Sequence, residues 1–196
     1  MVSRTVSRHA SDVGAVVAWA AKLPASAGGT RVVAIEGRSG SGKTELAGGV
    51  ASALGAPLVR MDDLYPGWDG LRGGVIALTE WVLAPLAGGG QARWRRWDWA
   101  ASRYAEWHET PRGDWLVVEG VGCGAAAVRP YLSGLVWLEA PVDQRRARAL
   151  ARDGEMYAPH WERWARQEDD FYGTDDVRAH AGLIIDTAET APSQPA

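Results

Sequence analysis

The chain has 196 residues, of which 46% are hydrophobic and 23% are charged, and its formal net charge is −3 at pH 7. These values are typical of one globular domain with a full hydrophobic core, and no apolar run reaches the roughly 20 residues that span a membrane. The slightly negative charge and the scattered arginines exclude a strongly basic surface, so we expect neither a duplex nucleic-acid partner nor a membrane.

The first predicted element is an amphipathic helix over residues 10–22, where apolar residues recur at helical spacing. An apolar β-type run over residues 32–36 predicts the first strand. A glycine-rich loop follows, then a helix over residues 44–54 that ends at Gly55. A second, short strand over residues 58–61 ends at two aspartates.

The loop after the first strand carries the most specific motif of the sequence. It has glycine, four residues, and then glycine, lysine and threonine. Glycines let successive backbone N–H groups surround a polyphosphate, the lysine reaches the β- and γ-phosphates, and the threonine hydroxyl binds Mg²⁺. A plain glycine turn is the alternative, but four fixed positions between a strand and a helix seldom match by chance. The predicted ATP-binding residues of this loop are Gly37, Arg38, Ser39, Gly40, Ser41, Gly42, Lys43 and Thr44.

The rest of the chain alternates between helices and strands. Helices are predicted over residues 73–86, 141–152, 159–171 and 175–181, and strands over residues 115–119, 134–139 and 183–186. Continuous apolar strands that alternate with helices predict an α/β fold, with a parallel five-stranded sheet covered on both faces. We expect one domain over residues 1–187 and a flexible tail over residues 188–196.

Carboxylates close two of the predicted strands. Asp62 and Asp63 end the second strand, and Glu119 ends the strand over residues 115–119. Sites on parallel sheets lie beyond the carboxyl ends of the strands, so these groups should lie near the phosphate loop. One carboxylate there could bind Mg²⁺ and another could accept the proton of an attacking hydroxyl, whereas helix capping is the structural alternative. For Asp63 the two interpretations are equally good.

From Met61-Asp62-Asp63-Leu64-Tyr65 onward, the sequence resembles the uridine kinase family of P-loop nucleoside kinases. Further matches follow in the right order over residues 31–187. Trp97-Asp98-Trp99 resembles the family's substrate segment, and Val118-Glu119-Gly120-Val121 resembles the end of one of its strands. The arginines near residue 150 resemble those of its lid helix. The resemblance implies the P-loop kinase fold, with ATP and Mg²⁺ as donor and metal and a small nucleoside-like acceptor.

The resemblance also implies roles for individual residues. Asp62 would be the general base, Tyr65 and Trp97 would contact the nucleobase or sugar, and Glu119 with Thr44, and Asp62 as a further candidate, would hold Mg²⁺. A lid over about residues 144–157 would close its arginines over the phosphates. These are Arg145, Arg148 and Arg152, whose spacing of i, i+3 and i+7 places them on one helix face.

The substrate side departs from the family pattern. The family's aspartate that holds the sugar hydroxyls has Asp69 as its nearest counterpart, and the lid lacks the family's Arg-Gly-Arg element. Trp68, Asp98 and Arg103 are further candidate substrate residues. The acceptor could therefore be another hydroxylated metabolite or an antibiotic, and a non-catalytic nucleotide-binding regulator is a third hypothesis.

One cysteine and the question of assembly complete the expectations. Cys123 cannot form an internal disulfide, and we expect it to be a small buried side chain. This favours a reducing cytoplasm. The sequence also allows a homo-oligomer.

Overall fold

The computed structural model describes residues 2–189, with side chains described for residues 10–155 and 157–189. Its centre is a five-stranded sheet in the order β2-β5-β1-β6-β7, in which every pairing is parallel. The strands are β1 (Arg31–Glu36), β2 (Leu58–Arg60), β5 (Trp115–Glu119), β6 (Gly134–Glu139) and β7 (Leu183–Asp186). The predicted parallel five-stranded α/β fold is confirmed.

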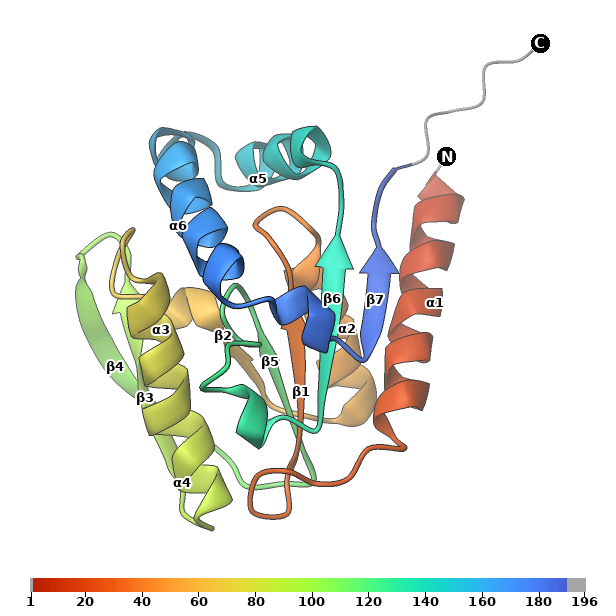
Figure 1. The fold of residues 1–196 in the computed structure, drawn as a ribbon, viewed down its shortest axis with the longest axis vertical. Coiled ribbons are helices and arrows are strands. Elements are labelled where there is room, and N and C mark those ends of the chain that lie inside the picture. The colour runs from red at the N-terminus through yellow and green to blue at the C-terminus, as the bar shows by residue number, and fades with distance from the viewer. Residues whose placement is uncertain (1, 190–196) are drawn as a thin grey trace.

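The two faces of the sheet are buried by different helices (Figure 1). Alternate residues of β1 belong to separate apolar clusters, with Val33 and Ile35 on one face and Val32 and Ala34 on the other. The first face packs against α1 (Val2–Ala20) and α2 (Lys43–Leu54). The second face packs against the helical stretch after β2 and against α6 (Trp161–Thr174). Both faces in the middle of β1 are therefore buried, which explains the unbroken apolar sequence of residues 32–35.

The helix predicted over residues 73–86 is longer than expected and changes its winding in the middle. It consists of α3 (Leu71–Ala77), a π-helical segment (Leu78–Leu83) and α4 (Ala84–Ala87). Pro85 lies at the start of α4 and has no N–H to continue an α-helical ladder. The π-type turn lies directly before this proline, as expected where the regular hydrogen-bond pattern is interrupted.

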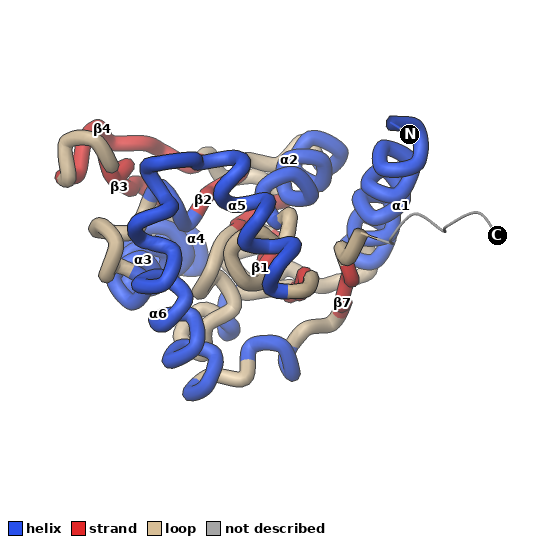
Figure 2. Tube along the Cα trace, turned by 90° about the horizontal axis from the view of Figure 1, so that it is seen from above, coloured by secondary structure: helices blue, strands red, loops and turns tan. Residues whose placement is uncertain are grey.

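An antiparallel hairpin stands apart from the sheet and has no counterpart among the predicted elements. It pairs β3 (Ala92–Asp98) with β4 (Arg103–Thr110), and its register shifts between Arg95 and Trp97. Figures 1 and 2 show it beside α3 and α4, at the end of the molecule where β2 forms the edge of the sheet. Trp94 is buried against that helical stretch, and its indole N–H donates to the Thr110 hydroxyl at 3.0 Å.

One helix lies over the carboxyl ends of the strands, and the next descends along one face of the sheet (Figures 1 and 2). The first, α5 (Val142–Tyr157), follows β6 and covers the predicted lid, and α6 follows it after a 3₁₀ turn (Ala158–His160). Gly154 has φ 54° and ψ −135°, which breaks the regular helix inside α5. A further 3₁₀ turn (Val177–His180) replaces the short helix predicted before β7.

Three smaller expectations can be compared with the structure. Cys123 is fully buried and unpaired, as predicted. Among the helices of residues 2–189, none is both long enough and apolar enough to cross a bilayer. The predicted flexible tail lies outside the described residues, apart from Ala188 and Glu189.

Candidate active site

The glycine-rich loop joins β1 to α2, as the motif requires. Gly37, Gly40 and Gly42 have φ values of 144°, 79° and 94°, which only glycine adopts without strain. A Cβ atom on Gly40 would lie 2.0 Å from the carbonyl oxygen of Arg145, so the loop packs directly on α5. The loop is thus held in one shape by backbone contacts that a larger residue would destroy.

Lys43 is the first residue of α2 rather than part of an exposed loop. Its side chain is 8% exposed, and its ammonium group donates to the carbonyl oxygen of Arg38 at 3.0 Å, across the loop. The charge therefore lies over the loop, together with the positive end of the α2 dipole. Arg38 itself points outward to α6, where its guanidinium lies 2.6 Å from Asp169 and over the ring of Tyr172.

A buried carboxylate fixes the base of the loop. Glu36 has no exposed surface and accepts hydrogen bonds from the backbone N–H groups of Gly37, Gly122 and Gly124 and from the hydroxyl of Tyr172, at 2.7–3.2 Å. Burial raises the pKa of Glu36 against the opposing effect of these donors. Sequence reasoning missed this residue, although a carboxylate at the end of a buried strand is a visible signal.

The predicted metal ligands lie together. The hydroxyl of Thr44 donates to Glu119 at 3.2 Å, and Asp62 is close enough to Glu119 to act on its titration. Burial is the main cause that raises the pKa of Glu119 to about 7, and the negative charge of Asp62 adds to it. No group of three or more acidic, histidine or cysteine side chains suited to a metal occurs among the described residues. A hydroxyl and one or two carboxylates are instead the ligands that a protein typically gives to a Mg²⁺ ion whose other ligands are phosphate oxygens and water.

The residues of the loop fit a polyphosphate. The hydroxyl of Ser41 is buried and has no hydrogen-bond partner among the described residues, so it remains able to donate. A Cβ atom on Gly42 would meet nothing within 4 Å, which leaves room for a ligand against the backbone. Hydroxyl and N–H donors, a lysine and a helix N-terminus are the groups that bind phosphate in proteins.

Replacing Glu119 by glutamine should remove part of the pH dependence of stability. The folded state keeps a proton on Glu119 up to about pH 7, whereas the unfolded chain releases it near 4.5. The stabilisation is therefore complete below pH 4.5 and is lost as the pH rises to 7, a change on the order of 3 kcal/mol. Urea unfolding of both proteins in EDTA from pH 4.5 to 8 measures the difference. If the unfolding free energies of the two proteins changed with pH in parallel, Glu119 would not be the group that keeps its proton up to pH 7. The Glu119→Gln variant should also need more Mg²⁺ for activity.

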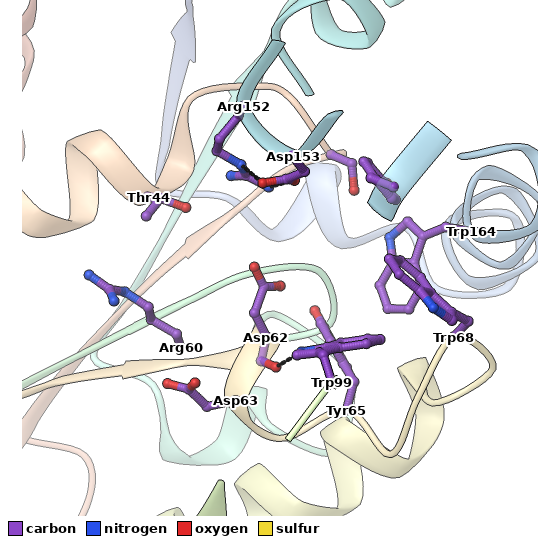
Figure 3. A pocket seen from close by; sticks show the side chains of 12 residues that line it. Thr44, Arg60, Asp62, Asp63, Tyr65, Trp68, Trp99, Arg152, Asp153 and Trp164 are labelled. Carbon is purple, nitrogen blue, oxygen red and sulfur yellow. Dashed lines mark hydrogen bonds and ion pairs between the residues drawn. The ribbon is translucent and has the colours of Figure 1, made fainter. Parts of the chain in front are cut away.

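A cavity of about 610 Å³ opens beside the phosphate loop (Figure 3). A much smaller hollow of about 30 Å³ adjoins it and is lined by Lys43, Thr44 and Glu119 among others. Five residues line both spaces: Ser39, Thr44, Asp62, Arg152 and Trp164. The larger cavity is also lined by Arg60, Asp63, Tyr65, Trp68, Trp99, Asp153 and Tyr157.

The structure brings only some of the predicted substrate residues to this cavity. Asp62, Tyr65 and Trp68 line it, and the buried hydroxyl of Tyr65 donates to the carbonyl oxygen of Val121 at 2.7 Å. Trp97, Asp98 and Arg103 lie on the hairpin and do not line it, and Asp69 is exposed and paired with Arg163. Hydroxyl binding by Asp69 therefore finds no support in its position.

Several lining residues were absent from the predicted site. Trp99 leaves the hairpin toward the cavity, and its indole N–H donates to the carbonyl oxygen of Asp62 at 3.0 Å. Trp164 and Tyr157 come from the helices above the sheet, far along the chain. Trp99 belongs to the segment that resembles the family's substrate segment, although only its neighbours Trp97 and Asp98 were predicted as site residues. The other two carry no sequence signal of their own.

The three arginines of α5 do not converge on one point, which corrects the expectation from their spacing. Arg145 donates to the carbonyl oxygens of Ala140 and Ser39, and Arg148 donates to the carbonyl oxygen of Thr187 at 2.8 Å. Only Arg152 lines the two spaces, where its guanidinium also pairs with Asp153. The long guanidinium side chains bind nearby backbone carbonyls, so the face that they share does not decide where their charges lie.

This arrangement predicts different losses for the arginine variants. Arg152→Ala should lower turnover by about 10-fold or more, because its guanidinium group lines both spaces, where phosphate oxygens would lie. Arg148→Ala should mainly lower the unfolding free energy, by about 1 kcal/mol, because it holds the segment after β7. Exposed Arg146 is the matched control. Steady-state kinetics and thermal melts of the three variants measure both effects, and equal turnover losses for Arg148 and Arg152 would contradict them.

Comparison with known proteins adds information about the fold. No family model matches the sequence, and no curated protein matches it. A solved structure described as a possible uridine kinase from Bacillus stearothermophilus matches with a TM-score of 0.67 and 19% identity, over 90% of this chain and 98% of that one. The chain has the fold of the P-loop kinases.

Two further P-loop kinase structures agree with this fold. A candidate fructose transport system kinase from Silicibacter sp. TM1040 has a TM-score of 0.55 at 18% identity, over 88% of this chain and 98% of that one. A sugar kinase from Janibacter sp. HTCC2649 has a TM-score of 0.50 at 18% identity, over 80% and 85%. The P-loop kinase fold accounts for the position of the loop and of Glu119 at neighbouring strand ends.

Proposed function

We propose that the protein is a kinase that transfers the γ-phosphoryl group of ATP, with Mg²⁺, to a hydroxyl group of a small molecule. One observation carries the proposal. The hollow lined by Lys43, Thr44 and Glu119 adjoins a cavity large enough for a small organic molecule, and Asp62 borders both. A donor phosphate and an acceptor hydroxyl could therefore meet beside one carboxylate.

The residues around this meeting point supply what phosphoryl transfer requires. Lys43 would balance charge on the β- and γ-phosphates, and Arg152, which lines the same hollow, would add a second positive charge near the transferred group. Thr44 and Glu119, with Asp62 in reach, would hold Mg²⁺, which neutralises the phosphate oxygens when bound. Asp62 would accept the proton of the acceptor hydroxyl as that oxygen attacks phosphorus.

The walls of the cavity favour an acceptor with a planar, apolar face. Trp68, Trp99 and Trp164 line it, and the ring of Trp68 lies 4.6 Å from that of Trp99. Aromatic walls bind planar rings by stacking, and the aspartates can accept hydrogen bonds from hydroxyl groups. We therefore propose a nucleoside of the uridine or cytidine kind as the acceptor.

A protein that consumes ATP and keeps an unpaired cysteine would act in the cytoplasm.

An acceptor screen tests the proposal. Purified protein, ATP and Mg²⁺ are incubated with single nucleosides, sugars, sugar acids and amino alcohols, and ADP release is compared with the rate without acceptor. We expect a pyrimidine nucleoside to raise the rate, with its phosphate ester found by mass spectrometry. Stimulation by a sugar alone would keep the kinase and change the acceptor. Tight nucleotide binding without stimulation by any acceptor would favour a nucleotide-binding regulator instead.

A further inference from the structure

One acidic side chain of α6 is buried beside the phosphate loop although no step described above uses it. Glu168 is 1% exposed and lies between Trp164 and Tyr172 at spacings of four residues, so all three share one helix face. A buried carboxylate is costly unless several donors compensate it. Its contacts therefore indicate what this position requires.

The donors come mainly from the phosphate loop. One oxygen of Glu168 accepts from the backbone N–H of Ser39 at 2.8 Å and from the Ser39 hydroxyl at 2.7 Å. The carbonyl oxygen of the same Ser39 accepts from Arg145 at 3.1 Å. Ser39 is thus held on both sides of its backbone, by a carboxylate from α6 and a guanidinium from α5, and its own donors point out of the loop.

The same carboxylate oxygen is connected to the large cavity. It accepts from the indole N–H of Trp164 at 3.2 Å, and Trp164 lines both spaces of the site. Gln167 directly precedes Glu168 in α6, and its side-chain amide donates to the carbonyl oxygen of Trp68 at 2.5 Å. The helix therefore contacts the phosphate loop and the wall of the cavity through neighbouring side chains.

We propose that Glu168 is a positioning residue that fixes Ser39, and with it the curvature of the phosphate loop, against the wall formed by Trp164. The inference rests on the proposed function, because it treats the loop as the binding site of a nucleotide. The three glycines with positive φ permit the curvature of the loop but do not fix it, so contacts from outside must hold its donors in place before they bind phosphate. Glu168 supplies that restraint from outside the loop, where it does not touch the ligand.

Binding of Mg²⁺-ADP, measured by calorimetry, tests the inference without an acceptor. Glu168→Ala should weaken binding by about 10-fold or more, because Ser39 loses its anchor. Glu168→Gln keeps a carbonyl oxygen for the same three donors and should bind within about 3-fold of the parent. Exposed Asp170 lies on the same helix, and Asp170→Asn is the matched control. Thermal melts show whether each variant folds.

A double-mutant cycle with Ser39→Ala identifies the path of the effect. The change removes the hydroxyl that donates to Glu168, so the two alanine variants together should lose less than the product of their separate losses. If Glu168→Ala fails to fold, the cycle is run with Glu168→Leu, which also removes the acceptor oxygens but fills the buried space, and coupling of less than 2-fold would overturn the inference. Unchanged or tighter binding by Glu168→Ala would overturn it while the proposed function stands. A parent that does not bind Mg²⁺-ADP would overturn both.

Discussion

Lys43→Ala is expected to reduce phosphoryl transfer by roughly 10²–10³-fold or more while the protein stays folded. The ammonium group is the only lysine charge at the phosphate loop, and it lies across the loop on the carbonyl oxygen of Arg38. Removing one preorganised positive group from a site where charge develops has costs of this size. The lost hydrogen bond to Arg38 should lower the unfolding free energy by only about 1 kcal/mol.

Two variants separate the charge of Lys43 from its packing. Lys43→Met keeps most of the side-chain volume at this nearly buried position and should lose as much activity as the alanine variant. Exposed Lys22 is the other lysine of the chain, and Lys22→Ala should behave like the parent. Acceptor-dependent ADP release and Mg²⁺-ADP titrations measure the effect. Full activity in either Lys43 variant would remove the phosphate-loop interpretation.

The sheet could be predicted because its strands are buried on both sides. The middle of a strand such as β1 must be apolar on both faces, and this signal lies within four consecutive residues, 32–35. The hairpin β3–β4 was not predicted, because arginine and tryptophan rather than aliphatic residues form the alternating pattern of its strands. Arg95 covers the rings of Tyr104 and Trp107 with its guanidinium, so a charged residue does the packing of an apolar one.

The site could be predicted only where the chain itself places residues together. The phosphate loop is continuous in sequence, and Asp62 and Glu119 follow strands whose order the fold determines. The roles assigned to these residues remain predictions. Glu168 and Trp164 lie more than 120 positions from the loop in the chain, and they reach it because α6 packs against one face of the sheet. Side-chain direction also limited the prediction, since Arg148 shares a helix face with Arg152 but binds Thr187.

Asp62 and Asp63 are adjacent, yet the structure gives them different surroundings. Both belong to the 3₁₀ turn Met61–Asp63 after β2. Asp62 lines the small hollow with Lys43 and Glu119, whereas Asp63 lines only the larger cavity. Figure 3 shows their carboxylates pointing in different directions, with that of Asp62 toward the space below Arg152. Burial and the charge of Asp62 raise the pKa of Asp63, so the choice of Asp62 as the base rests on its position in the small hollow and not on basicity.

Asp62→Asn should therefore lower turnover by about 10²–10⁴-fold with little change in ATP affinity, because a general base contributes only when the hydroxyl loses its proton. The asparagine keeps the backbone carbonyl that accepts from Trp99, so the wall of the cavity should persist. Asp63→Asn is the matched control and should lose less than about 10-fold. Kinetics at several Mg²⁺ concentrations separate the two roles considered for Asp62. Recovery of the Asp62→Asn rate at high Mg²⁺ would make this carboxylate a metal ligand, and a larger loss in Asp63→Asn would make Asp63 the base.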